Sequence, residues 1–166
     1  MDPTKLLKKQ HREVQALFRQ VEKTESGNRR RDLMNQIVES LQLHMKIEEE
    51  IFYPALREIG TKKAEELTLE AYEEHGVAKL VMKQLPQVDP NDDRFEAKMT
   101  VFKELIAHHV DEEEHEMFKL AGKIGEDELN VLGNRMMEEI ARAGGHEGPA
   151  KSGRRNGRPR GATASR

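Results

Sequence analysis

Two segments of the chain contain a histidine followed four residues later by a glutamate, at positions where a helix would otherwise bury hydrocarbon. His44 and Glu48 form the first pair, and His109 and Glu113 form the second. Residues four apart project from one face of a helix, so each pair can bind the same metal ion or adjacent ions. Burying an unpaired carboxylate is costly, and a bound cation removes that cost. The spacing therefore favours metal coordination inside a helical protein.

A single histidine precedes each pair and also lies on an apolar helix stripe. His11 lies 33 residues before His44, and His75 lies 34 residues before His109. Four antiparallel helices with short loops would bring these groups to one level of a bundle. Four imidazoles and two carboxylates suit two ions of iron, manganese or zinc better than calcium or magnesium. The predicted ligands, with the carboxylates as bridges, are His11, His44, Glu48, His75, His109 and Glu113.

The second pair has a competing interpretation. His108 and Glu112 have the same spacing, and they would give a more regular repeat of 33 residues. Their helix face is more polar, whereas His109 lies on an apolar stripe, so we prefer His109 and Glu113. We expect His115 to be a solvated helix residue.

The elements that must position these residues are predicted to be helices. Asp2-Pro3 is typical of a helix start, and a second helix over about 31–56 should end or kink at Pro54. Further helices should follow Gly60-Thr61 and the loop at 86–93, where an Asp or Asn is the expected cap. The expected fold is all-α: an antiparallel up-down four-helix bundle with a short additional C-terminal helix. We assign residues 1–143 to this bundle, with the ligands inside 3–120, and residues 144–166 to a disordered basic tail rich in Gly, Arg and Pro.

Composition limits the classes of function. The chain has 166 residues and no cysteine, which excludes thiolate chemistry, cysteine-ligated clusters and disulfides. We see no signal peptide and no apolar stretch long enough to cross a membrane, so we expect a cytoplasmic protein without membrane contact. Charged residues make up 36% of the chain and aromatic residues 4%, which indicates helices with solvated outer faces. Apart from one inward glutamate in each, the acidic runs 48–50 and 112–114 should be mostly solvated faces.

Over about residues 3–120 the chain resembles the hemerythrin-like family, also called the HHE cation-binding domain. The matching segments are Lys-Lys-Gln-His11-Arg-Glu-Val, His44-Met-Lys-Ile-Glu48-Glu-Glu-Ile-Phe-Tyr-Pro, Glu-Glu-His75 and His109-Val-Asp-Glu-Glu113-Glu-His-Glu-Met-Phe. The resemblance implies a four-helix bundle, a non-haem di-iron centre, and binding of or reaction with oxygen, nitric oxide or peroxide. We therefore expect two carboxylate-bridged iron ions, although the ligand types also suit manganese or zinc.

The chain departs from the family pattern at two places. Members that carry oxygen reversibly have another histidine one turn from the third-helix ligand, but Ala71 and Lys79 occupy those positions here. The resemblance thus implies a coordination position left for water or a substrate, with Tyr72 either nearby or an ordinary helix tyrosine. Gln10 stands where the family often has an aspartate, which removes a carboxylate partner of a ligand.

The tail has a charge opposite to that of the body. Residues 144–166 carry a net charge of +5, which leaves −8 on residues 1–143 from a total of −3. Arg154-Arg155-Asn156-Gly157-Arg158-Pro159-Arg160-Gly161 resembles an AT-hook for the DNA minor groove, with Asn156 in place of the usual arginine. We favour a solvated tail over nucleic-acid contact.

Three functions remain after these observations. The favoured one is a di-iron protein that binds or reacts with a small diatomic molecule or peroxide, in sensing or detoxification. One rival is a regulatory protein with a structural metal site and a tail that contacts nucleic acid, and the other is a peroxide-consuming enzyme. We expect a metal-dependent binding or redox protein rather than a dedicated enzyme. The sequence leaves the oligomeric state open.

Overall fold

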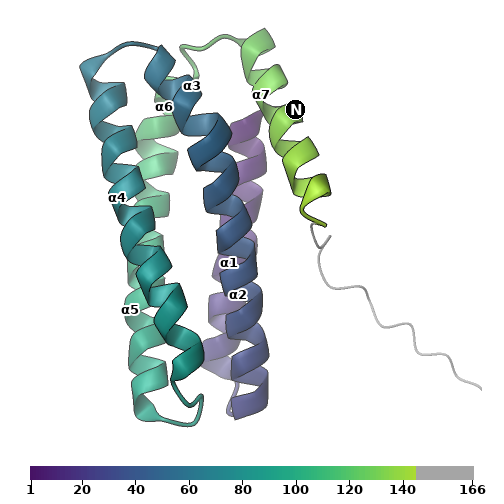
Figure 1. The fold of residues 1–166 in the computed structure, drawn as a ribbon, viewed down its shortest axis with the longest axis vertical. Coiled ribbons are helices and arrows are strands. Elements are labelled where there is room, and N and C mark those ends of the chain that lie inside the picture. Colours follow the sequence, from purple (N-terminus) through teal and green to yellow (C-terminus); the bar gives the residue numbers. More distant parts are fainter. Residues whose placement is uncertain (145–166) are drawn as a thin grey trace, which may run out of the picture.

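Four long helical segments run antiparallel to form a bundle, and a fifth helix lies along its outside (Figure 1). The structure is a computed structural model that describes residues 1–144. The bundle consists of α1 (Pro3–Lys23), α2 (Gly27–Ile47) with η1 (Glu48–Phe52) and α3 (Tyr53–Glu58), α4 (Lys62–Gln84) with the 3₁₀ turn η2 (Leu85–Gln87), and α5 (Asp93–Glu112) with η3 (Glu113–Met117) and α6 (Phe118–Ala121). The fifth helix is α7 (Glu126–Arg142), which contacts α1 and α2. The all-α bundle with an additional C-terminal helix is confirmed. Residues 145–166, and with them nearly all of the predicted basic tail, lie outside the described residues.

Side-chain caps set the starts of the bundle helices. A side-chain oxygen of the preceding residue accepts a hydrogen bond from an amide of the first turn in each case. The caps are Asp2, Ser26, Thr61 and Asp92. The caps at Asp2 and in the 86–93 loop agree with the prediction. The second helix begins at Gly27, earlier than the predicted start near residue 31, because Ser26 accepts a hydrogen bond from the Arg29 amide.

The second helical segment does not end at Pro54. It continues to Glu58 because a π-helical turn, η1, precedes the proline. Proline has no N–H to donate to the carbonyl four residues back. In η1 the amide of Tyr53 donates to the carbonyl of Glu48, five residues earlier. The helix therefore passes through the proline by changing its hydrogen-bond spacing.

The same turn leaves one carbonyl without its usual donor. The Glu49 carbonyl would pair with the amide of Tyr53 in an α-helix or with that of residue 54 in a π-helix, but Tyr53 donates to Glu48 and Pro54 has no N–H. The hydroxyl of Tyr72 on α4 donates to this carbonyl at 3.0 Å. A tyrosine of a neighbouring helix thus completes the turn.

The apolar core is divided into two clusters with a polar layer between them. One cluster includes Val14, Leu41 and Val110, and the other includes Leu7, Ile47 and Met117. In each bundle helix the predicted ligands lie between residues of the two clusters. The buried polar layer is therefore isolated from solvent at both ends.

The N-terminus holds α7 against the bundle through a close backbone approach. A Cβ atom added at Gly133 would lie 1.7 Å from the carbonyl oxygen of Met1, and the Met1 ammonium donates to the Asn134 side chain at 3.2 Å. Only glycine fits at this contact. Within residues 1–144, no helix combines the length and apolar character that a membrane span requires.

Candidate metal centre

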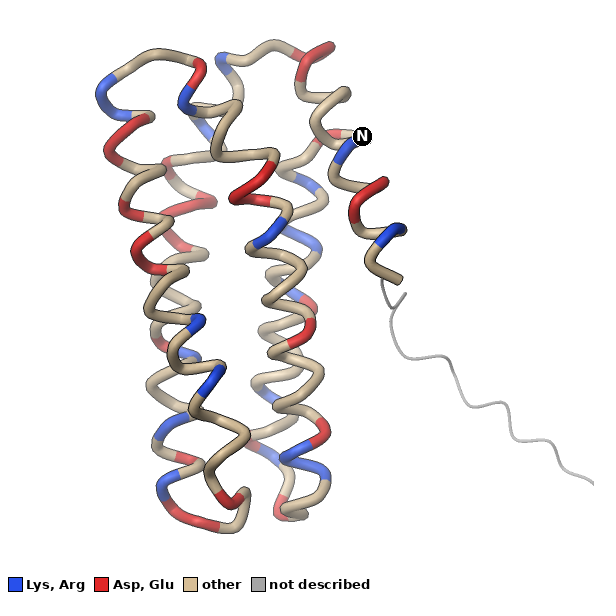
Figure 2. Tube along the Cα trace, viewed as in Figure 1, with Lys and Arg blue, Asp and Glu red and all other residues tan. Residues whose placement is uncertain are grey.

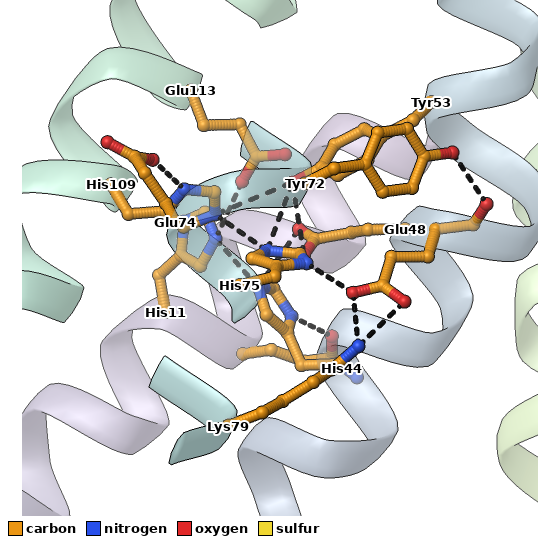
Figure 3. Close-up of polar contacts among 12 residues, drawn as sticks. His11, His44, Glu48, Tyr53, Tyr72, Glu74, His75, Lys79, His109 and Glu113 are labelled. Atoms are coloured by element: carbon orange, nitrogen blue, oxygen red, sulfur yellow. Dashed lines mark hydrogen bonds and ion pairs between the residues drawn. The ribbon is translucent and has the colours of Figure 1, made fainter. Parts of the chain in front are cut away.

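All six predicted ligands meet in the buried polar layer (Figure 3). The imidazole residues are at most 4% exposed, and both glutamates are 0% exposed. His11 Nε2 lies 3.1 Å from His44 Nε2, and His75 Nε2 lies 3.1 Å from His109 Nε2. The competing His108 has a side chain that is 66% exposed, so His109 is the inward residue. The structure therefore gathers the six groups, and their role as metal ligands stays a prediction.

These side chains form two ligand groups that share one carboxylate. His11, His44, Glu48 and Glu113 make the first group, and Glu48, His75 and His109 make the second. One Glu48 oxygen lies 3.0 Å from His44 Nε2, and the other lies 3.4 Å from His75 Nε2. Glu48 is thus placed to bridge two ions. The expected second bridge, Glu113, belongs to the first group alone.

The chemistry of this layer fits two cations. Glu48 Oε1 and both carboxylate oxygens of Glu113 are buried and accept no hydrogen bond from the described residues. Each pair of Nε2 atoms can share at most one proton. Buried acceptors that face one another are strongly unfavourable unless something positive lies between them. A pair of metal ions would satisfy all of these atoms.

Each imidazole also has a partner on its outer side. The Nδ1 atoms lie 2.6–2.9 Å from side-chain oxygens, so Nδ1–H donates outward and Nε2 faces the centre. Metal-ligating histidines are held in this way. The partners are Glu114 for His11, Gln10 for His44, Glu49 for His75 and Glu74 for His109.

Two residues of the acidic runs, which were predicted to be mostly solvated, also contact the centre. Glu49 and Glu114 accept hydrogen bonds from buried imidazoles and are only 22% and 29% exposed at their side chains. Glu74 was not recognised at all. A sequence signal existed, because every outer partner is adjacent in sequence to a ligand. In each case the residue next to a ligand on one helix lies beside the ligand imidazole of an adjacent helix.

Charges in the layer shift the ionisation of its members. Burial lowers the pKa of His109, but the hydrogen bond to Glu74 and the charge of Glu113 outweigh it and raise that pKa to about 9. Burial and the nearby Glu48 raise the pKa of Glu113 to about 7. Burial lowers the pKa of His44, which has no carboxylate on its outer side.

Tyr53 is a site residue that the sequence prediction missed. Its hydroxyl lies 3.2 Å from His75 Nε2, 3.4 Å from His109 Nε2 and 3.5 Å from Glu48 Oε2. Tyr53, and not Tyr72, is the tyrosine beside the ligands of the second group. The Tyr72 hydroxyl instead donates to the backbone carbonyl of Glu49. Burial and the Glu48 charge raise the pKa of Tyr53 well above its usual value, so the hydroxyl keeps its proton.

The two π-helical turns explain how this residue reaches the centre. Each turn begins at a buried glutamate, η1 at Glu48 and η3 at Glu113. A π turn brings the fifth following residue to the same face, which is Tyr53 in the first half and Phe118 in the second. The Phe118 ring is parallel to the His11 ring, with centroids 6.1 Å apart. At this position the two halves therefore differ by one hydroxyl group.

A small cavity borders the centre. Its volume is about 10 Å³, close to that needed for one water molecule. Gln10, His11, His44 and His109 form its polar wall, and aliphatic and methionine side chains form the rest. The space beside these three imidazoles is therefore mostly apolar.

Fold and site together define a helical-bundle metal-binding protein. Residues 2–121 match the family described as "Hemerythrin HHE cation binding domain". Because this match covers most of the chain, the protein belongs to the hemerythrin HHE cation-binding family, as the motifs predicted.

Two relatives extend this comparison. A crystal structure of an HHE cation-binding domain-containing protein from Mycobacterium kansasii superposes with a TM-score of 0.75 and 24% identity, over 86% of this chain and 87% of that one. This likeness shows the fold. A protein of Nostoc sp. described as a DNA nickase is 25% identical over 113 residues, which is 68% of this chain and 31% of that protein. The chain thus spans about a third of the length of this curated relative.

Proposed function

We propose that the protein holds two non-haem iron ions bridged by a carboxylate and that it binds or reacts with oxygen, nitric oxide or peroxide in sensing or detoxification. The observation that carries this proposal is the convergence of four imidazoles and two buried carboxylates, three of whose four oxygens accept no hydrogen bond from the described residues. The family supports a cation, and the mixture of imidazole and carboxylate supports iron, with manganese or zinc as competitors.

The ligand sets of the two ions would be unequal. His11, His44 and Glu113 would hold one ion and His75 and His109 the other, with Glu48 between them. The second set offers fewer protein ligands. Bound iron would supply electrons and Lewis acidity to a small molecule. The poorer half is therefore where such a molecule would find room.

The chain's own residues prepare that half for a small ligand. The Tyr53 hydroxyl keeps a proton within hydrogen-bond reach of His75 and His109, so it can donate to a ligand held there. The outer contacts of Nδ1 hold the rings in place, and the apolar clusters above and below exclude water. A built-in proton donor suits reaction with oxygen or peroxide better than passive storage.

DNA contact is a second candidate. The relative from Nostoc is described as a DNA nickase, and residues 144–166 of this chain are strongly basic. Removal of residues 145–166 separates the two proposals. Lost DNA binding with an unchanged metal content would support the second function, whereas unchanged DNA binding would contradict it.

The test of the main proposal is the metal content of protein purified without oxygen, followed by its ultraviolet–visible spectrum as air is admitted. We expect about two irons per chain and new near-ultraviolet bands in air. Glu48→Ala should lose both, whereas the control His115→Ala, altered at an exposed side chain, should keep both. One zinc ion or no metal in the wild type, with no spectral change, would overturn the proposal. Catalytic consumption of peroxide, as opposed to a single stoichiometric event, would identify an enzyme.

A further inference from the structure

A second group of metal-ligating side chains lies just outside the buried centre. Glu74 of α4 and His108 and Glu112 of α5 each offer a ligand atom, and these atoms lie within 4.8 Å of one another. His108 Nε2 is 3.5 Å from a Glu74 oxygen and 3.8 Å from a Glu112 oxygen. Ligands at about 2.1 Å around a tetrahedral ion are about 3.4 Å apart, so small side-chain movements would close this set around a cation. This is the His-x-x-x-Glu pair that the buried centre does not use.

The outer group is open to solvent. The His108 side chain is 66% exposed, that of Glu112 is 30% exposed and that of Glu74 is 15% exposed. A hydrated ion can therefore reach the histidine directly. The exposure falls in steps from His108 to Glu74, toward the interior.

The group lies on an acidic part of the surface. Among residues 1–144, no lysine or arginine forms an ion pair with Glu70, Glu74 or Glu112. Acidic residues gather along the adjoining half of α4 (Figure 2). Such a surface raises the local concentration of divalent cations.

One carboxylate connects the outer group to the buried centre. Glu74 Oε2 accepts from Nδ1 of His109 at 2.6 Å, while Glu74 Oε1 faces His108. The same side chain thus touches an exposed imidazole and a buried one, and the two histidines are adjacent in sequence. Among the described residues, no other outer partner of the centre belongs to such a ligand group.

From these contacts we propose that Glu74, His108 and Glu112 form a surface site that captures a divalent transition-metal ion such as Fe²⁺, Mn²⁺ or Zn²⁺ and supplies it to the buried centre. Imidazole with two carboxylates suits these ions. The supplying role rests on the proposed function, since it requires a metal in the buried centre. The capturing role does not.

The capturing role is tested by counting the Co²⁺ ions bound to the metal-free full chain in anaerobic equilibrium dialysis. We expect three per wild-type chain and one fewer in both His108→Ala and Glu112→Gln. The matched control is His115→Ala, because His115 also pairs with an acidic residue four positions away, Asp111, but lacks a third ligand. Equal stoichiometry in the wild type and both variants overturns the site. A failed buried centre gives a different result, one ion in the wild type and none in His108→Ala.

The supplying role is tested by the rate at which metal-free protein takes up Fe²⁺ without oxygen. His108→Ala should load the buried centre several-fold more slowly than the wild type and reach the same final content there. His115→Ala should load at the wild-type rate. Equal rates in His108→Ala and the wild type overturn the supplying role.

Discussion

Gln10 Oε1 accepts a hydrogen bond from Nδ1 of His44 at 2.8 Å, and it is the one amide among the four outer partners of the buried imidazoles. The other three imidazoles donate to carboxylates. A neutral acceptor makes an imidazole less basic than a carboxylate does. Since Gln10 replaces the aspartate that the family often has, the consequence of that departure falls on His44 of the neighbouring helix.

Removal of this contact should weaken the metal site without emptying it. Gln10→Ala should lower metal affinity by about 10- to 100-fold, the usual effect of losing an outer partner of a histidine ligand. Gln10→Glu should bind metal at least as tightly as the wild type. Competition with a coloured chelator measures both. Equal affinities in Gln10→Ala and the wild type would show that Gln10 does not orient His44.

Glu113 should favour metal binding at the expense of the metal-free fold. Glu113→Gln keeps the side-chain volume but removes a buried charge whose oxygens accept no hydrogen bond. At a pH above 9, where His109 has lost the proton that compensates this charge, we expect the metal-free Tm to rise by several degrees and the bound metal to decrease. Glu138→Gln, at an exposed position of α7, is the control and should change neither. A lower metal-free Tm in Glu113→Gln would contradict this account.

The metal-free protein should lose stability as the pH rises above 6.5. The pKa of His109 is raised to about 9 and that of His11 is also raised, so the folded chain binds these protons more tightly than the unfolded chain. Their contribution is complete below the unfolded value of 6.5 and is lost as the pH rises through the folded values. For His109 it is on the order of 3 kcal/mol. Glu113, with its pKa raised to about 7, acts in the same direction from 4.5 upward.

Thermal unfolding between pH 6.5 and 9 checks this sign. With a chelator present, Tm should fall across the range. With metal bound it should hold or rise, because metal and protons compete for the same atoms. Parallel curves with and without metal would rule out titration of the ligands as the cause.

Tyr53→Phe separates a proton donor from a packing residue. The variant keeps the buried ring and loses the hydroxyl, so its metal content should be unchanged. The spectral change on admitting air should slow by about 10- to 100-fold, which is the effect expected from losing one hydrogen bond to a charged group. Tyr72→Phe is the matched control. Its hydroxyl bonds to the Glu49 carbonyl, so it should lower stability by about 1 kcal/mol and leave the reaction rate unchanged. Equal rates in Tyr53→Phe and the wild type would refute the donor role.

Gly133→Ala tests how α7 is held against the bundle, and Gly76→Ala in α4 is the comparison. Gly133→Ala places a Cβ against the Met1 carbonyl, so we expect α7 to separate and the free energy of unfolding to fall by about 1–3 kcal/mol. At Gly76, in the exposed middle of α4, a Cβ meets nothing within 4 Å. Gly76→Ala should raise stability by about 0.5–1 kcal/mol through helix propensity. Circular dichroism melts of both variants supply the comparison.

The sequence was sufficient for the fold and for the six side chains that converge in the centre. Residues three and four positions apart lie on one helix face, so the sequence alone places His44 and Glu48 together. The choice of His109 over His108 followed from the apolar character of its stripe. Caps such as Asp2 were visible because their chemistry is local.

The outer partners and Tyr53 were not predictable by the same reasoning. Glu49, Glu74 and Glu114 bond to imidazoles of other helices, and such contacts depend on how the helices are rotated against one another. Tyr53 was missed because a period of 3.6 residues places it off the ligand face. Only a change of hydrogen-bond spacing brings it there, and no periodicity argument contains that change.

The π turn before Pro54 also has a consequence for the length of the chain. It amounts to one residue more than a regular helix would need between Glu48 and the proline. Deleting one residue there would restore ordinary spacing and leave the tyrosine four positions after Glu48, still on the ligand face of a regular helix. The proline ring would then press on a carbonyl of the preceding turn. The extra residue therefore accommodates the proline, and a chain one residue shorter would keep the phenol beside the centre on a helix that the proline strains.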